Sequence, residues 1–262
     1  MRYFIELSFN GTKYHGWQIQ KTGISVEEVL ENCLSSLLKM PVNIIGAGRT
    51  DSGVHAKQFF AHFDYPYFLT PRFIQKLNSF LPKDIKVYNI YLMQPKAHAR
   101  FSALCRTYEY FISLGKSPFF KEFSWQWLSN PPDIAKMNQA AMILKRYEDF
   151  STFCKSHSNN KTSFCKIEYS YWKYKKGLLC FQITSNRFLR NMVRSIVGTL
   201  IRVGIGKIDS KDFCQIVESK NSKMAGCSVP AKGLFLKSVS YPSDIFCITP
   251  CLLMRREIGR IL

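Results

Sequence analysis

The chain has 262 residues and carries 37 Lys and Arg against 18 Asp and Glu, so its formal net charge at pH 7 is +19. Hydrophobic residues make up 46% of the chain and aromatic residues 15%, which is enough apolar material for a packed core and excludes a predominantly disordered protein. This charge attracts polyanions, so nucleic acid is the first candidate partner and an anionic membrane surface the second, with a basic but inert surface as the alternative.

The sequence carries no clear membrane, secretion or metal-binding signal. Its most apolar stretch, Ile196–Ile205, is shorter than the about 18 residues of a membrane-spanning helix and is interrupted by an arginine. Glu6 lies where a signal peptide would be apolar. The nine cysteines include no C-x-x-C pair, and Cys154, His157 and Cys165 match metal-ligand spacing only weakly. We therefore expect a cytoplasmic protein without a metal and without a membrane partner.

Hydrophobic periodicity predicts the elements of the first half. Residues Arg2–Phe9 alternate between apolar and polar positions, which predicts a half-buried strand. Ser25 stands three residues before Glu28, a capping-box spacing that predicts a helix ending before Pro41. Further predicted elements are strands at Val42–Ala47 and Lys57–Asp64, a helix from Thr70 to Pro82, and strands at Ile85–Met93 and Arg106–Leu114.

The second half repeats this plan after an aromatic, proline-containing segment without periodicity. Its predicted elements are a helix from Asp133 to Arg146, strands at Lys166–Lys175 and Leu178–Ser185, a long helix from Arg187, a short helix from Ser210 and a strand at Leu234–Tyr241. We predict an α+β fold with a largely antiparallel sheet. The predicted divisions are an N-terminal lobe (1–116), a connection (117–132), a C-terminal lobe (133–241) and an extension (242–262). The extension carries Arg255, Arg256 and Arg260, to which no role is assigned.

The segment Gly46–Ala56 is the densest in candidate functional residues. Strand-like spacing would place Arg49 and Asp51 on one side, and an arginine beside the carboxylate would keep it charged and able to act as a nucleophile or base. An Asp close to Gly is also an ordinary turn former, and both interpretations stay open. Ser52 and His55 lack the orienting carboxylate of a serine hydrolase, so we expect His55 to be a hydrogen-bonding residue of the turn.

The predicted helix from Arg187 has a cationic face. At about 100° per residue, Arg187, Arg190, Asn191 and Arg194 share one side, opposite an apolar stripe. Arginine suits bidentate recognition of phosphate, although a charged helix face is commonly only solvated.

Tyr108 lies on an alternating strand with several cations nearby, Arg100 and Arg106 among them. An aromatic ring flanked by arginines is typical of a base-stacking platform, because the ring supplies a π-face and the cations bind phosphates. A core tyrosine is the other interpretation.

The run Gly48–Ala56, which reads GRTDSGVHA, closely resembles the active-site motif of the tRNA pseudouridine synthase A family. Other blocks resemble the family in the same order along the chain, from about Arg2 to Tyr241. They are Phe9–Thr12, Gly16–Gln20, Arg106–Tyr110, Phe150–Cys154, Phe188–Gly198 and Pro230–Leu234. Asn10 and Ser52 depart from the usual pattern, where Asp and Ala are common, and neither change removes a proposed catalytic group.

The resemblance implies an isomerase that converts uridine to pseudouridine at positions 38, 39 and 40 of the tRNA anticodon stem-loop, without metal or organic cofactor. By motif position, Asp51 is the catalytic nucleophile and attacks either the ribose or the uracil. Arg49 and Arg194 pair with its carboxylate. Tyr108 lies against the uracil and can help to remove the C5 proton, while Arg187 and Arg190 face phosphates.

The resemblance also implies two α/β lobes that share a continuous sheet around a basic central cleft, in a homodimer whose tRNA contacts both subunits. The target nucleotide is expected to leave its stack, at a cost of a few kcal/mol that phosphate contacts offset. A pseudouridine synthase that acts on other RNA uridines, and a non-catalytic tRNA-binding protein of the same fold, are the alternatives.

Overall fold

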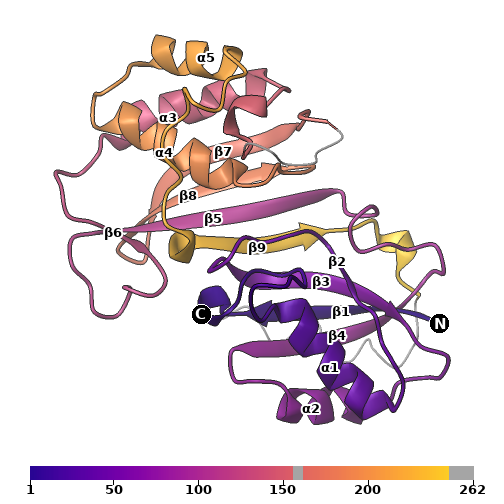
Figure 1. Ribbon diagram of the computed structural model, residues 1–262. Coiled ribbons are helices and arrows are strands. Elements are labelled where there is room, and N and C mark those ends of the chain that lie inside the picture. The colour runs from indigo at the N-terminus through magenta and orange to yellow at the C-terminus, as the bar shows by residue number, and fades with distance from the viewer. Residues whose placement is uncertain (156–161, 248–262) are drawn as a thin grey trace.

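The computed structural model describes residues 1–155 and 162–247, and within them nine strands form one sheet (Figure 1). The main path runs β4-β1-β3-β9-β5-β8-β7, with β2 paired to β3 and β6 to β5. The strands are β1 (Arg2–Phe9), β2 (Ile45–Gly46), β3 (His55–Asp64), β4 (Ile85–Met93), β5 (Cys105–Leu114), β6 (Trp125–Trp127), β7 (Ile167–Lys175), β8 (Leu178–Ser185) and β9 (Leu234–Ser240). The helices are α1 (Val26–Leu38), α2 (Pro71–Phe80), α3 (Ile134–Ile143), α4 (Met192–Gly204) and α5 (Ser210–Glu218).

The sheet is largely antiparallel, as the sequence predicts, and the α+β class is confirmed. Only the β3–β9 and β5–β6 pairs are parallel among the pairings of the described residues. Strand β9 comes late in the chain and inserts between β3 and β5. Its Leu236 pairs with Ala56 on one side and with Tyr108 on the other. One strand from the second half therefore joins the two halves into a continuous sheet.

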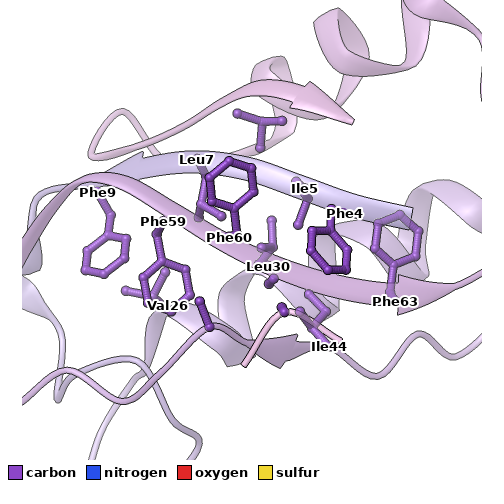
Figure 2. Close-up of a cluster of buried hydrophobic side chains, with 14 of the residues drawn as sticks. Phe4, Ile5, Leu7, Phe9, Val26, Leu30, Ile44, Phe59, Phe60 and Phe63 are labelled. Carbon is purple, nitrogen blue, oxygen red and sulfur yellow. The ribbon is translucent and has the colours of Figure 1, made fainter. Parts of the chain in front are cut away.

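Helix α1 shows how local sequence sets the first half. The Ser25 hydroxyl accepts from the Glu28 backbone N–H at 3.2 Å and completes the predicted capping box. Val26, Leu30 and Leu34 recur every four residues and are buried in a hydrophobic core. Figure 2 shows Val26 and Leu30 among the apolar side chains of this core. Replacing a buried leucine of this kind with alanine costs about 2–5 kcal/mol of stability.

Two large hydrophobic cores lie on the sheet, besides a small cluster around Phe111. The first packs α1 and α2 against β1, β3 and β4, and the second packs α3, α4 and α5 against β5, β7 and β8. Tyr108 contacts both cores. Because Ala56, Leu236 and Tyr108 stand opposite one another in register, their side chains share a face. Helices α1 and α4 therefore cover the same face of the sheet, on either side of Tyr108.

The strand predicted at Val42–Ala47 is shorter than expected and consists of Ile45–Gly46. Side chains of α1 satisfy backbone donors before it, since Val42 N donates to Ser35 Oγ at 2.9 Å and Ile44 N to Glu31 Oε1 at 2.7 Å. The backbone N–H groups of these residues therefore bond to side chains of α1 and do not take part in strand pairing.

The helix predicted from Arg187 begins five residues later, at Met192, and the predicted cationic helix face is wrong. Asn191 has φ 67°, a left-handed conformation that interrupts any helix at this point. Of the four polar residues assigned to that face, only Arg194 lies on α4. Eleven of the 13 residues of α4 are buried, so the helix is part of the core around nearly its whole circumference.

The remaining divisions stay predictions. The expected connection contains the short strand β6, which pairs with Ile112–Leu114 of β5. The segment Ser243–Ile245 forms a single 3₁₀ turn, and Phe246 packs on Phe4. Arg255, Arg256, Arg260 and His157 lie outside the described residues. Within residues 1–155 and 162–247, no helix is long and apolar enough to cross a membrane, and no cluster of three metal-ligating side chains occurs.

Candidate active site

The loop between β2 and β3 carries Asp51 in a tight turn. Val54 N donates to Asp51 O at 3.1 Å, and Gly53 adopts φ 77°, which favours glycine. The loop is fixed to the segment after β1, because Gly53 N donates to Tyr14 O at 3.2 Å. A side chain at Gly16 would collide with the Thr50 carbonyl oxygen, so only glycine permits this close approach. The turn interpretation is thus correct for the backbone of this segment.

The Asp51 carboxylate points toward α4. Its Oδ2 lies 3.3 Å from Arg194 Nη1. Arg194 Nε donates to the Val229 carbonyl at 2.7 Å, which fixes the plane of the guanidinium. Both side chains are partly buried, with Asp51 26% and Arg194 20% exposed. The pair joins a loop of the first core to a helix of the second, and it agrees with the expected contact between Asp51 and Arg194.

Arg49 does not make the expected contact with the Asp51 carboxylate. Its side chain is exposed, and the ion pair of Asp51 within the described residues is with Arg194, not with Arg49. Residues 47–54 are not a strand, so alternation does not determine which side the side chains take. The charge of Arg49 acts on Glu27 instead, where it partly opposes the burial that raises the pKa of that carboxyl.

Tyr108 occupies the centre of the sheet, near Asp51. Burial raises its pKa to about 12; the Arg106 charge opposes this shift and the Asp51 charge adds to it. Its ring meets Phe188 edge-on, with centroids 5.0 Å apart. The residue is still partly exposed, so it is both a core tyrosine and accessible at the surface.

Arg187 and Arg190 lie in the loop before α4. Arg187 Nη1 donates to the Thr162 carbonyl at 3.3 Å, and Arg190 is exposed while its carbonyl accepts from Lys155 N at 3.1 Å. The same loop carries Phe188 to Tyr108. The structure therefore brings Asp51, Arg194 and Tyr108 together and places Arg187 and Arg190 on an adjoining surface loop.

Arg106 is a central residue whose contacts the sequence did not reveal. Its guanidinium donates to three backbone carbonyls, those of Ala47 at 2.8 Å, Arg100 at 2.6 Å and Asn186 at 2.8 Å. Burial lowers the pKa of Arg106. Arg106 lies in a family-like block of the sequence, Arg106–Tyr110, but a sequence cannot show which main-chain carbonyls a side chain will contact.

His55 forms hydrogen bonds, as expected, and also links distant segments. Its Nδ1 accepts from Gly11 N at 3.0 Å, so Nε2 carries the proton and donates to the Lys232 carbonyl at 3.1 Å. Burial lowers the pKa of His55 and favours this neutral form. The Lys232 contact, which crosses to the second half of the chain, was not predicted.

Glu109 forms a second unpredicted cluster on the opposite face of the sheet from Tyr108. Its carboxylate is fully buried and contacts the ammonium groups of Lys57 at 2.6 Å, Lys175 at 2.7 Å and Lys237 at 3.5 Å. Burial alone would raise the pKa of Glu109, but hydrogen bonds from Lys175 and Lys57 outweigh it and the pKa is lowered. The cluster ties β5 to β3, β7 and β9.

Comparison with known proteins decides the family. A family model described as tRNA pseudouridine synthase matches residues 143–242. A tRNA pseudouridine synthase A of Bacteroides fragilis is 48% identical over 248 residues, covering 94% of this chain and 98% of the relative. The chain belongs to the tRNA pseudouridine synthase A family. Relatives of that name from Azobacteroides pseudotrichonymphae and Treponema denticola are 49% and 38% identical, each over 94% of this chain and over 98% and 95% of the relatives.

The family membership confirms the resemblance that the sequence motifs carry. In this tRNA pseudouridine synthase A family member, the matched region 143–242 includes α4 with Arg194 and the whole of β9. Asp51 lies before that region, on the loop whose residues 48–56 carry the family-like motif. The Asp51–Arg194 contact is therefore made between two separate family-like segments.

Proposed function

We propose that this protein isomerises uridine to pseudouridine at positions 38, 39 and 40 of the tRNA anticodon stem-loop, with Asp51 as the nucleophile. The observation that carries the proposal is the ion pair of Asp51 with Arg194, beside Tyr108. The relatives named tRNA pseudouridine synthase A support the reaction and the substrate class.

Uridine and pseudouridine are isomers, so the reaction needs no external reactant. The bond from ribose C1′ to N1 of uracil breaks, the base turns, and C1′ bonds to C5. C5 then loses its proton and N1 gains one. Asp51 can form its covalent bond with C1′ or with the uracil ring, and both routes require a carboxylate held at a fixed angle. Arg194 provides that orientation, because Val229 holds its own guanidinium in place.

Tyr108 acts as a neutral group in this scheme. With a pKa of about 12, only about one molecule in 10⁵ carries the phenolate at pH 7. Its ring and hydroxyl contact the uracil, and removal of the C5 proton by Tyr108 requires that its own proton leaves first. Arg187 and Arg190 supply phosphate contacts, which offset the cost of taking the uridine out of its stack. Arg49, which is exposed in the same loop as Asp51, remains part of the proposed catalytic group.

The proposal includes a homodimer in which tRNA contacts both subunits, in the cytoplasm where tRNA is processed. The sheet face opposite α1 and α4 offers a surface for the second copy. It bears a cavity of about 330 Å³ whose lining includes Tyr88, Phe123 and Phe235. Light scattering after gel filtration should give twice the chain mass of 30.4 kDa. A particle of 30.4 kDa would remove the dimer from the proposal.

The decisive experiment is to incubate the protein with unmodified tRNA and to map pseudouridine along the product. Modification at positions 38 to 40 supports the proposal. Modification at other uridines selects the alternative of a synthase with another target site. Binding without any modification selects the alternative of a tRNA-binding protein.

A further inference from the structure

Residues His98–Leu104, the second part of the loop between β4 and β5, present an exposed aromatic side chain. Phe101 is 76% exposed, and Leu104 on the same loop is 57% exposed. The Arg100 guanidinium lies 5.6 Å from the centroid of the Phe101 ring. A large aromatic ring with an arginine beside it and little cover is the combination that single-stranded nucleic acid recognises.

The loop is ordered by its own hydrogen bonds. His98 Nδ1 accepts from the backbone N–H groups of Arg100 at 3.1 Å and Phe101 at 3.3 Å. Ser102 Oγ accepts from His98 N at 3.0 Å, and Ser102 N donates to His98 O at 2.9 Å. The His98 ring packs against Phe101 with centroids 4.3 Å apart. Because Phe101 is supported from one side, it can receive a ligand on the other with little loss of conformational entropy.

Arg106 holds this loop next to the Asp51 segment. Its Nη2 donates to both the Arg100 and Ala47 carbonyls, so these two carbonyls are neighbours. Its Nη1 donates to the Asn186 carbonyl, one residue before Arg187. Arg106 lies two residues before Tyr108 on β5, so their side chains share a face of the strand. Three segments thus converge on one guanidinium beside Tyr108, and the Phe101 loop is one of them.

We propose that Phe101 contacts the tRNA substrate by stacking on an unpaired base near the target uridine, with Arg100 binding the adjoining phosphate. This inference rests on the proposed function, since it adds a contact to the same site. A single-stranded loop is the part of tRNA that can offer such a base, because its bases are not all paired. The net charge of +19 and the arginines that border the loop match the charge of that ligand.

The test compares variants of the full chain in binding to unmodified tRNA, measured by fluorescence anisotropy over a range of salt concentrations. Phe101→Ala should weaken binding about 5- to 150-fold without changing the salt slope, because stacking does not release counterions. Phe101→Leu should lose nearly as much affinity, and Phe101→Trp should retain it. Arg100→Gln should lower the slope of log affinity against log salt by about one. Phe80→Ala is the matched control, since Phe80 ends α2 and is 56% exposed.

Three results would overturn the inference: equal affinity of Phe101→Ala and wild type, equal affinity of Phe101→Leu and wild type, or a change of oligomeric mass in Phe101→Ala, which would assign the ring to a subunit contact. Pseudouridine formation by the wild type is measured in parallel. If the wild type binds tRNA but makes no pseudouridine, the proposed function fails while the affinities still decide the role of Phe101. If the wild type does not bind tRNA, both fail.

Discussion

Replacing Asp51 with Asn separates the chemistry of this residue from its structural contribution. The ion pair with Arg194 spans 3.3 Å, which corresponds to about 5 kcal/mol of Coulomb attraction at an effective dielectric constant of 20. Most of this is cancelled by desolvation, and both side chains are about one-fifth to one-quarter exposed, so the net contribution is at most about 1 kcal/mol. An Asn oxygen can still accept from Arg194. We expect the melting temperature of Asp51→Asn to change by no more than about 3 °C.

Activity should respond very differently. Loss of a nucleophile lowers the rate at least about 10⁴-fold, so Asp51→Asn should form no measurable pseudouridine in single-turnover mapping. Its tRNA affinity should stay equal or become slightly tighter, because the substitution removes a negative charge from a basic surface.

A companion variant, Arg194→Lys, keeps the positive charge but cannot contact Val229 and Asp51 together in the same geometry, so it should lower kcat more than it raises KM. Wild-type turnover by Asp51→Asn would refute the assignment of the nucleophile. A drop of more than about 10 °C in its melting temperature would refute the assignment of a mainly chemical role.

Four further predictions test the surrounding structure. Burial, with the charges of His98 and Arg2, lowers the pKa of His62 to about 4, and the unfolded chain therefore binds more protons between pH 6.5 and 4. Stability should be complete above pH 6.5 and fall by about 3 kcal/mol toward pH 4 in urea titrations, with a flatter profile for His62→Asn, whose oxygen can replace the acceptor. Glu109→Gln should cost about 1–3 kcal/mol, read as a lower denaturant midpoint, because the buried carboxylate loses its charge and its contacts with three partly exposed lysines, whereas Asp64→Asn at a surface pair should cost under about 1 kcal/mol. Arg106→Lys should lower stability by about 1–3 kcal/mol in the same titrations, since an ammonium cannot reach all three carbonyls; unchanged stability would contradict the role of that cluster. Arg190→Gln should lower the salt slope of tRNA affinity by about one, and an unchanged slope would remove Arg190 from the RNA contacts.

Local signals in the sequence predicted most of the elements. Strands β1, β4 and β8 begin and end at the residues predicted from the sequence, and α1 begins at its capping box. These features depend on neighbours within a few residues, so a sequence contains them in full. The start of α4 was missed because the left-handed Asn191 follows Arg187–Arg190, whose side-chain pattern fits a helix. The left-handed backbone of Asn191 therefore keeps the helix from beginning earlier, although the side-chain pattern continues across it.

The sequence predicted the contact of the site that is made between two side chains, Asp51 and Arg194, but not those made to main-chain carbonyls. Asp51 lies in a distinctive motif, and the family resemblance supplied Arg194 as its partner. The convergence on Arg106 could not be predicted, because its three acceptors are main-chain carbonyls from segments that are distant in sequence. The expected contact of Arg49 with Asp51 also depended on the path of the backbone, which the sequence did not determine. The alternation used to place it assumes a strand, and the chain turns there instead.

The late position of β9 has a consequence for synthesis of the protein. Strands β3 and β5 are finished by residue 114, yet β9, which lies between them, starts at residue 234. Until β9 has been synthesised, each of the two strands has a partly unpaired edge, and a growing chain with such edges can associate with other chains. Tyr108 also lacks its neighbour Leu236 during this period. The two halves of the sheet are therefore joined only once residues 234–240 have been synthesised.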